Sequence, residues 1–185
     1  MNLEQLQQYT KDFPAIPISI NFEMGDFDPI AVTQQFDQPD KPCFLLTGKP
    51  KKTEDGYSFI GLNPTLTLTY RNGELATTDS QGDVSHETTE LKPVLERILA
   101  NNKMPKFHHL PPFSGGLVGY FSYDYARYAT TASLPKVNDS MGLNDVDLLL
   151  IDQVIAYNHT TKTVTLTQVI PSSQLNDQYH LSLIH

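Results

Sequence analysis

The side chains that could do chemistry in this sequence fall into small groups, and none of them forms a complete catalytic set. Asp145, Asp147 and Asp152 are close enough in sequence to suggest a carboxylate metal site. We favour a structural interpretation, with Asp145 and Asp147 at the entrance of a strand and Asp152 facing solvent. His108 and His109 are adjacent, and adjacent side chains of an extended segment point to opposite sides, which disfavours a shared metal ion.

Two potential nucleophiles lack the surroundings that would activate them. Ser114 precedes a pair of glycines, but no GxSxG elbow surrounds it and the sequence places no base beside it. Cys43 opens a short apolar run, where an unpaired cysteine usually packs as a small hydrophobic side chain. We therefore predict that the chain carries no catalytic residue and no metal ligand.

The most distinctive composition is that of residues 111–127, PPFSGGLVGYFSYDYAR. Its glycines are not followed by the Lys-Ser/Thr pair of a phosphate loop. Glycine that enters and interrupts a strand instead indicates close approach of another backbone or of a ligand. Strand alternation predicts that the side chains of this segment lie on two faces. From spacing alone, these side chains could pack in the core or dock on another surface, and both interpretations stay open. One face would carry Tyr120, Ser122 and Asp124, and the other Phe121, Tyr123 and Tyr125.

Composition limits the class of protein. The chain has 185 residues, enough for one domain with its own core. Its net charge of -8 argues against nucleic acid as a partner, because phosphate binding requires basic patches. No stretch approaches the roughly 18 apolar residues of a membrane span, and the amino terminus does not resemble a secretory signal. Together with the single cysteine, these features predict a cytoplasmic protein without a membrane partner.

Hydrophobic periodicity predicts an α+β fold, mainly antiparallel sheet with flanking helices. Asn72-Gly73 is typical of a two-residue hairpin turn between two of the strands. Residues 78–87 are polar and are predicted to form a loop. The predicted strands are 16–22, 43–46, 57–62, 65–70, 73–77, 116–123, 146–157 and 162–170. The predicted helices are 2–9, 28–36, 89–101 and a short one within 124–128.

Three ordered motifs make the chain resemble the large subunit, component I, of anthranilate synthase. Residues 112–127 resemble its PF(S/T)GG-x-x-GY-x-SYD segment. Residues 44–46 resemble the start of its FLLES motif, and residues 56–63, GYSFIGLN, resemble RYSFIG-(L/x)-(D/N). The IPIS stretch at 16–19 fits the opening strand of the family. The resemblance covers about residues 13–170 and concerns the amino-terminal domain only.

The resemblance implies a part of a larger orthogonal β-sandwich, as in anthranilate and aminodeoxychorismate synthases. Residues 1–170 would be the amino-terminal domain, and 171–185 the start of a linker to a chorismate-binding domain. The family enzyme is a lyase of tryptophan biosynthesis that makes anthranilate from chorismate and ammonia or glutamine. Its Mg²⁺ and catalytic residues lie in the chorismate-binding domain, and a glutamine amidotransferase subunit, component II, delivers ammonia. This chain is therefore expected to hold no cofactor of its own and to be inactive alone.

The resemblance also implies a feedback site for L-tryptophan. Position by position, its residues would be Leu46, Thr47, Gly48, Tyr57 and Ser58, with residues 111–116 nearby. The family has Glu-Ser where this chain has Thr47-Gly48. Losing one hydroxyl hydrogen bond costs about 0.5–1.5 kcal/mol, so weakened tryptophan binding is expected.

Other interpretations stay open. Aminodeoxychorismate synthase shares the architecture but more often reads Gly-Tyr-Asp-Leu at the end of the long motif, whereas residues 122–125 are SYDY here. A non-catalytic amino-acid-binding module and a non-functional fragment are the remaining alternatives. A front part of the family enzyme should expose a large apolar patch where the rest of the sandwich packs.

Overall fold

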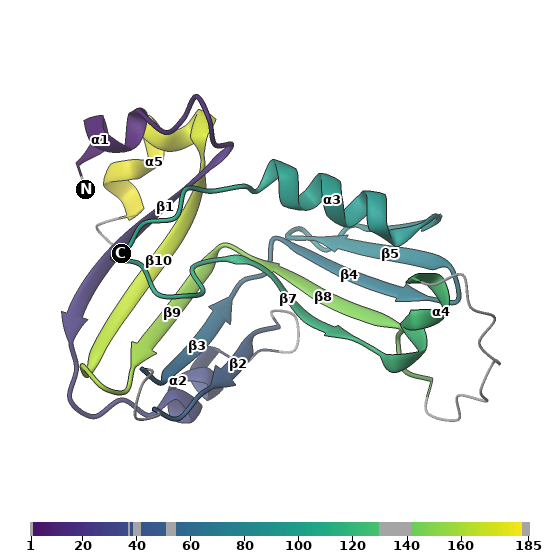
Figure 1. Cartoon of the computed structure of the whole chain (residues 1–185), viewed down its shortest axis with the longest axis horizontal. Helices are drawn as coiled ribbons and strands as arrows, with labels where there is room; N and C mark the ends of the chain where they lie inside the picture. The colour runs from purple at the N-terminus through teal and green to yellow at the C-terminus, as the bar shows by residue number, and fades with distance from the viewer. Residues whose placement is uncertain (1, 37, 39–41, 51–54, 130–141, 183–185) are drawn as a thin grey trace.

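The fold consists of two antiparallel five-stranded sheets with a few short helices (Figure 1). The computed structural model describes residues 2–36, 38, 42–50, 55–129 and 142–182. Sheet I has the strand order β1-β10-β9-β3-β2, and sheet II has the order β6-β5-β4-β8-β7. All pairings between these strands are antiparallel, so the α+β prediction is confirmed.

The element bounds follow the predicted strands closely. Sheet I contains β1 (Ala15–Glu23), β2 (Phe44–Thr47), β3 (Tyr57–Leu62), β9 (Gln153–Asn158) and β10 (Thr163–Pro171). Sheet II contains β4 (Leu66–Arg71), β5 (Glu74–Asp79), β6 (Val84–Thr88), β7 (Gly116–Phe121) and β8 (Val146–Ile151). The helices are α1 (Leu3–Gln7), α2 (Pro29–Phe36), α3 (Leu91–Asn101), α4 (Ala126–Ala129) and α5 (Leu175–Ser182), with 3₁₀ turns η1 (Tyr123–Tyr125) and η2 (Ser172–Gln174).

Two chain segments pass from one sheet to the other. The chain leaves β3 of sheet I and enters β4 of sheet II, and it returns from β8 to β9 through Asp152 (Figure 1). The run 146–157, predicted as one strand, is therefore two strands. At this bend the Val169 N–H donates to the Asp152 carbonyl at 2.7 Å, which ties β10 to the turning point.

The two predicted hairpin turns form as expected. Asn72 and Gly73 both have positive φ, 52° and 87°, and connect β4 to β5. In the turn from β9 to β10, the side-chain oxygen of Asn158 accepts from the N–H groups of Thr160 and Thr161 at 2.8 and 3.0 Å. Both sets of contacts fix the strand registers that position the residues discussed below.

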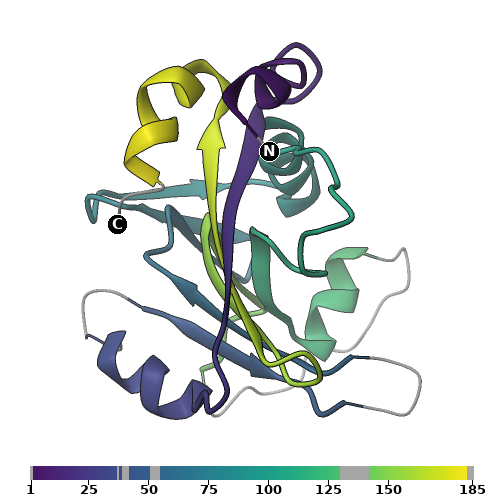
Figure 2. The same cartoon turned by 90° about the vertical axis from the view of Figure 1, so that its left-hand side faces the viewer.

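The core forms at three places. In sheet II, α3 packs on the strands through Leu91 and Val94. Phe59 of sheet I, near the junction of the sheets, packs with residues such as Ile151. At the other end of sheet I, α1 and α5 lie side by side over β1 and β10 (Figure 2). The buried residues of this third cluster are Leu6, Ile16, Ile18, Ile170 and Leu175.

Some sequence-based predictions were wrong. Residues 78–87 were predicted to be loop, but Val84–Thr88 form the edge strand β6, whose side chains are all exposed and so carry no alternating pattern. Part of the predicted linker, 172–182, is η2 and α5 and folds against the domain. Leu175 is only 1% exposed, and Asn176 accepts a 2.7 Å hydrogen bond from the Gln7 amide. The domain boundary at residue 170 itself stays a prediction. No helix among the described residues is long and apolar enough to cross a membrane.

Candidate effector site at the β2–β3 hairpin

The five residues predicted to bind an effector lie together in the β2–β3 hairpin. Leu46 pairs with Phe59 and Thr47 pairs with Ser58. One step further, the Gly48 N–H donates to the Tyr57 carbonyl at 2.7 Å. The neighbourhood inferred from two separate motifs is therefore present, while the effector role of these residues stays a prediction.

The same register places these residues on both faces of sheet I. Alternation puts Leu46 and Tyr57 on the face of Phe59, and Thr47 and Ser58 on the other. Leu46 is 58% exposed, whereas Ser58 is 1% exposed. One ligand on one face therefore cannot contact the side chains of all four non-glycine residues, and Leu46 and Tyr57 are the pair that shares an accessible side.

Ser58 already has a hydrogen-bond partner within the protein. Its hydroxyl lies 2.8 Å from Nε2 of His159, whose ring meets Tyr157 edge-on at 4.9 Å. The buried hydroxyl is thus satisfied by the turn that follows β9, and its contribution is to hold that turn against β3. The sequence could not indicate His159 for this contact, because the two residues are 101 positions apart and no motif connects them.

An aromatic cluster supports the accessible face of the hairpin. Tyr57 stacks on Phe59 at 5.5 Å with an interplanar angle of 13°. Phe113 meets Phe44 and Phe59 edge-on at 5.7 and 5.9 Å. The expectation that residues 111–116 lie close to the hairpin is therefore confirmed. Gly61 is required here, because a Cβ would lie 2.0 Å from the Phe44 ring.

Polar groups gather where the hairpin meets the end of β9. The Asn158 amide nitrogen donates to the Tyr57 hydroxyl and to Oδ2 of Asp55, both at 3.0 Å. The segment after β2 and the segment before β3 lie very close together here, because a Cβ at Gly56 would lie 2.2 Å from the Pro50 nitrogen. Asp55 was not among the sequence-predicted site residues, and the motif comparison offered no signal for it.

The glycines of the long motif pack backbone against backbone. Gly119 has φ 151°, and a Cβ there would lie 2.0 Å from the Asp147 carbonyl oxygen on β8. The predicted close approach is confirmed. The alternation of aromatic faces was wrong beyond Phe121, because η1 ends the strand there. Tyr125 packs edge-on against Tyr70 at 6.2 Å, whereas Tyr123 is 90% exposed.

The three aspartates have separate structural surroundings. Asp145 is buried and accepts from the Asn72 N–H at 2.9 Å and the Tyr128 hydroxyl at 3.2 Å. Asp152 does not face solvent as predicted: it is half-buried at the bend, and burial raises its pKa to about 6. Within the described part of the chain, no three His, Cys, Asp or Glu side chains gather as metal ligands would.

The other singled-out residues also have structural contacts. The Ser114 side chain is buried and donates to the Pro111 carbonyl at 3.0 Å, which closes the turn that carries Phe113. His109 stacks on Phe107 at 5.6 Å. Among the described residues, neither side chain contacts a group that could activate it.

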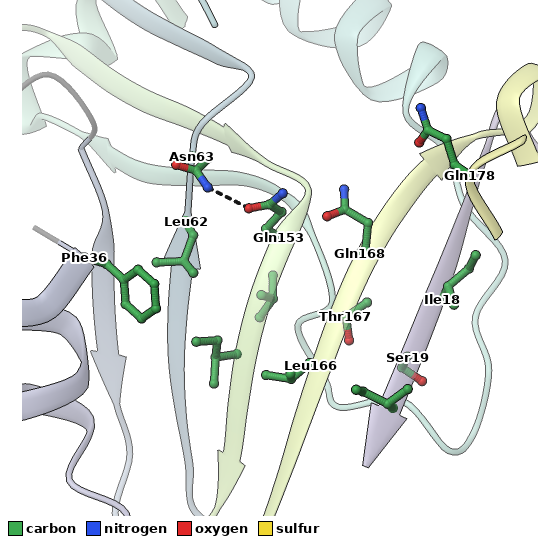
Figure 3. Close-up of a pocket in the computed structure, with 13 residues that line it drawn as sticks. Ile18, Ser19, Phe36, Leu62, Asn63, Gln153, Leu166, Thr167, Gln168 and Gln178 are labelled. Atoms are coloured by element: carbon green, nitrogen blue, oxygen red, sulfur yellow. Dashed lines mark hydrogen bonds between the residues drawn. The ribbon is translucent and has the colours of Figure 1, made fainter. Parts of the chain in front are cut away.

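The face of sheet I opposite to Leu46 and Tyr57 carries a broad, open groove, and Figure 3 shows side chains that line it. The volume of the groove is about 730 Å³. Side-chain amides run along one side of it, where the Asn63 amide donates to Gln153 at 2.8 Å. Its apolar lining includes Ile18, Ile20, Phe36, Leu62, Ile155 and Leu166, and its other amides are Gln168 and Gln178. This face therefore carries an open groove with an apolar lining, while the large exposed apolar patch stays a prediction.

Three curated relatives share the name anthranilate synthase component 1. Those from Acetivibrio thermocellus and Bacillus subtilis are 30% and 32% identical to this chain, over 88% and 83% of it. The protein from Saccharomyces cerevisiae is 30% identical over 85% of the chain. The chain spans only 33%, 29% and 31% of their respective lengths.

The other comparisons give less. No family model matches the chain. A crystal structure of anthranilate synthase component I from Streptococcus pneumoniae covers 89% of this chain, with 20% identity and a TM-score of 0.47, and the chain covers 37% of it. On the sequence relatives and on the three ordered motifs, the chain belongs to the anthranilate synthase component 1 family and is related to the amino-terminal part of its members.

Proposed function

We propose that this chain forms the amino-terminal scaffolding and regulatory part of an enzyme that makes anthranilate from chorismate. The observation that carries the proposal is the combination of about one-third coverage of the relatives with an open apolar groove on sheet I. An antiparallel sheet with an uncovered apolar face is typical of a domain that packs against another layer.

The groove is the proposed contact with the chorismate-binding part of such an enzyme. Leu62, Ile155 and Leu166 come from three neighbouring strands and line the groove together. Leu62 and Leu166 are labelled in Figure 3. Covering them removes apolar area from water, at roughly 25 cal/mol per Å². The second layer would complete the orthogonal β-sandwich that the family resemblance implies.

The chemistry of the reaction is assigned to that other part. Ser58 and His159 form a serine–histidine contact, and Ser58 is 1% exposed. A buried hydroxyl of this kind cannot reach a substrate. The chorismate-binding part would hold Mg²⁺ and chorismate and would receive ammonia from a glutamine amidotransferase subunit. The reaction would take place in the cytoplasm.

The regulatory role is proposed for the β2–β3 hairpin. L-Tryptophan would contact Leu46 and Tyr57, with Thr47, Gly48 and Ser58 shaping the strands behind them. Gly48 offers no side-chain hydroxyl, and the hydroxyl of Ser58 is taken by His159. We therefore expect the chain alone to bind tryptophan weakly, and micromolar affinity in calorimetry would contradict this.

Anthranilate fluorescence tests the proposal. With chorismate, Mg²⁺ and ammonia, the chain alone should produce no anthranilate above background. Adding the separately expressed chorismate-binding part of the Bacillus subtilis relative should raise turnover above that of the part alone. Turnover by the chain alone would contradict the division of roles, and no effect of mixing would contradict the scaffolding role.

A further inference from the structure

Strand β6 (Val84–Thr88) is an edge of sheet II, and its hydrogen-bonding pattern is fixed at both ends. Among the described strands, β6 pairs with β5 alone. Before β6, the Asp79 N–H donates to the Asp83 carbonyl at 3.1 Å, and after β6 the Thr89 N–H donates to the Gly73 carbonyl at 3.4 Å. Hydrogen-bonded pairs of an antiparallel ladder recur at every second residue. The odd-numbered residues of this segment are therefore the ones that bond to β5.

The even-numbered residues of β6 direct their backbone groups away from the sheet. They are Val84, His86 and Thr88, whose N–H and C=O groups point to the side opposite β5. All side chains of β6 are exposed, so the described part of the chain leaves this edge open to a partner. A row of outward N–H and C=O groups of this kind can pair with an added strand.

The charge around this edge selects the kind of strand that fits it. Asp83 and Glu87 lie on the face of sheet II that α3 covers, because Glu87 pairs with Leu75 of that core. Between Arg71 and Lys92 the sequence has no basic side chain, whereas its acidic ones are Glu74, Asp79, Asp83, Glu87 and Glu90. Two copies of β6 would bring acidic side chains close together, which disfavours self-pairing. A basic segment would instead meet opposite charges across the new pair.

We propose that β6 binds an extended, basic segment of a partner protein as an additional strand of sheet II. Backbone hydrogen bonds to the even-numbered residues hold the segment, and its lysine or arginine side chains on the α3 side pair with Asp83 and Glu87. The other face of this edge carries Val84 and Thr88, so β-branched residues fit the alternate positions of the segment. Neither the groove on sheet I nor the β2–β3 hairpin takes part, so the contact is independent of the proposed function.

The experiment is a chemical-shift titration of the full chain with a short blocked peptide of alternating lysine and valine. The same peptide with glutamate in place of lysine is the comparison. The lysine peptide should shift the amide signals of Val84, His86 and Thr88, slow their hydrogen exchange, and bind more weakly as salt is added. The glutamate peptide should not bind. Equal binding of the two peptides, or unchanged β6 signals with the lysine peptide, would overturn the assignment.

Two variants separate the charge from the backbone contact. Glu87→Gln should weaken lysine-peptide binding about two- to fivefold, as for one exposed charge pair, whereas Glu4→Gln, at an exposed glutamate on α1, should leave it unchanged. His86→Pro removes one outward N–H, which an edge strand tolerates, and should weaken binding further. Equal affinity of wild type and Glu87→Gln would contradict the charge pairing. Self-association of the chain that His86→Pro abolishes would make a second copy the occupant and overturn the assignment.

Discussion

Single residues explain why the motifs have their particular composition. Gly61 admits the Phe44 ring, and Gly119 lets β7 approach the backbone of β8. In each case the glycine is needed for close packing. Ser58 likewise serves the fold, since its hydroxyl is bonded to His159. The motifs therefore identify the scaffold more directly than they identify a binding site.

Replacing Gly119 by alanine should destabilise the chain by about 3 kcal/mol or more, because the added Cβ overlaps the β8 backbone at a strained φ. Urea denaturation followed by circular dichroism measures this. The matched control is Gly25→Ala, because a Cβ at Gly25 meets no atom within 4 Å. Equal stability of the two variants would contradict the close approach seen at Gly119.

Asp152 should make stability depend on pH. Burial raises its folded-state pKa from 3.8 to about 6, and hydrogen bonding to its own backbone N–H and to the Gln168 side chain offsets this in part. Its stabilising contribution is then fully present below pH 3.8 and is lost as the pH rises through 6. After allowance for its partial exposure, Asp152→Asn should be about 1 kcal/mol more stable than wild type at pH 7.5.

Urea midpoints measured between pH 4 and 8 test the Asp152 prediction. The stability difference of about 1 kcal/mol between wild type and Asp152→Asn should disappear at the acid end. Asp12→Asn, which changes an exposed carboxylate, is the control for removing one negative charge elsewhere on the chain. A parallel shift of the Asp152→Asn curve at all pH values would show that the carboxylate's ionisation does not cause the difference.

At the scale of elements, most strands were predictable and the contacts between distant ones were not. Alternation in TLTLTY and the Asn72-Gly73 turn sufficed for the β4–β5 hairpin. β6 was missed because its exposed edge position imposes no apolar pattern. α5 was missed because its sequence has no clear caps, and it is held by tertiary packing of Leu175. The Asn158 contacts join residues about 100 positions apart, beyond any local pattern.

The packing of α5 can be measured directly. Leu175→Ala should lower the free energy of unfolding by about 2–5 kcal/mol, as for a leucine removed from a core. Leu99→Ala removes a leucine that is 55% exposed on α3, and it should change stability by less than about 0.5 kcal/mol. A small effect at Leu175 would mean that residues 172–182 are not part of the domain core.

At the scale of the whole molecule, the two sheets share one chain path but differ in what covers them. Helix α3 packs on sheet II, whereas sheet I has helices at its edge and at one end and leaves an apolar groove between them. The hairpin with Asp55 and the groove lie on opposite faces of sheet I. The proposed effector binding and the proposed packing against a second layer therefore concern separate surfaces, and we expect that each can be altered without the other.

The most direct test of the scaffolding role is the restored anthranilate fluorescence measured with two variants of this chain. Leu166→Gln places a polar side chain in the groove, and Leu99→Gln makes the same change at an exposed leucine on α3. With the chorismate-binding part present, Leu99→Gln should restore turnover like wild type, and Leu166→Gln should lose most of it while keeping its fold by circular dichroism. Equal restoration by both variants would contradict the assignment of the groove as the contact surface.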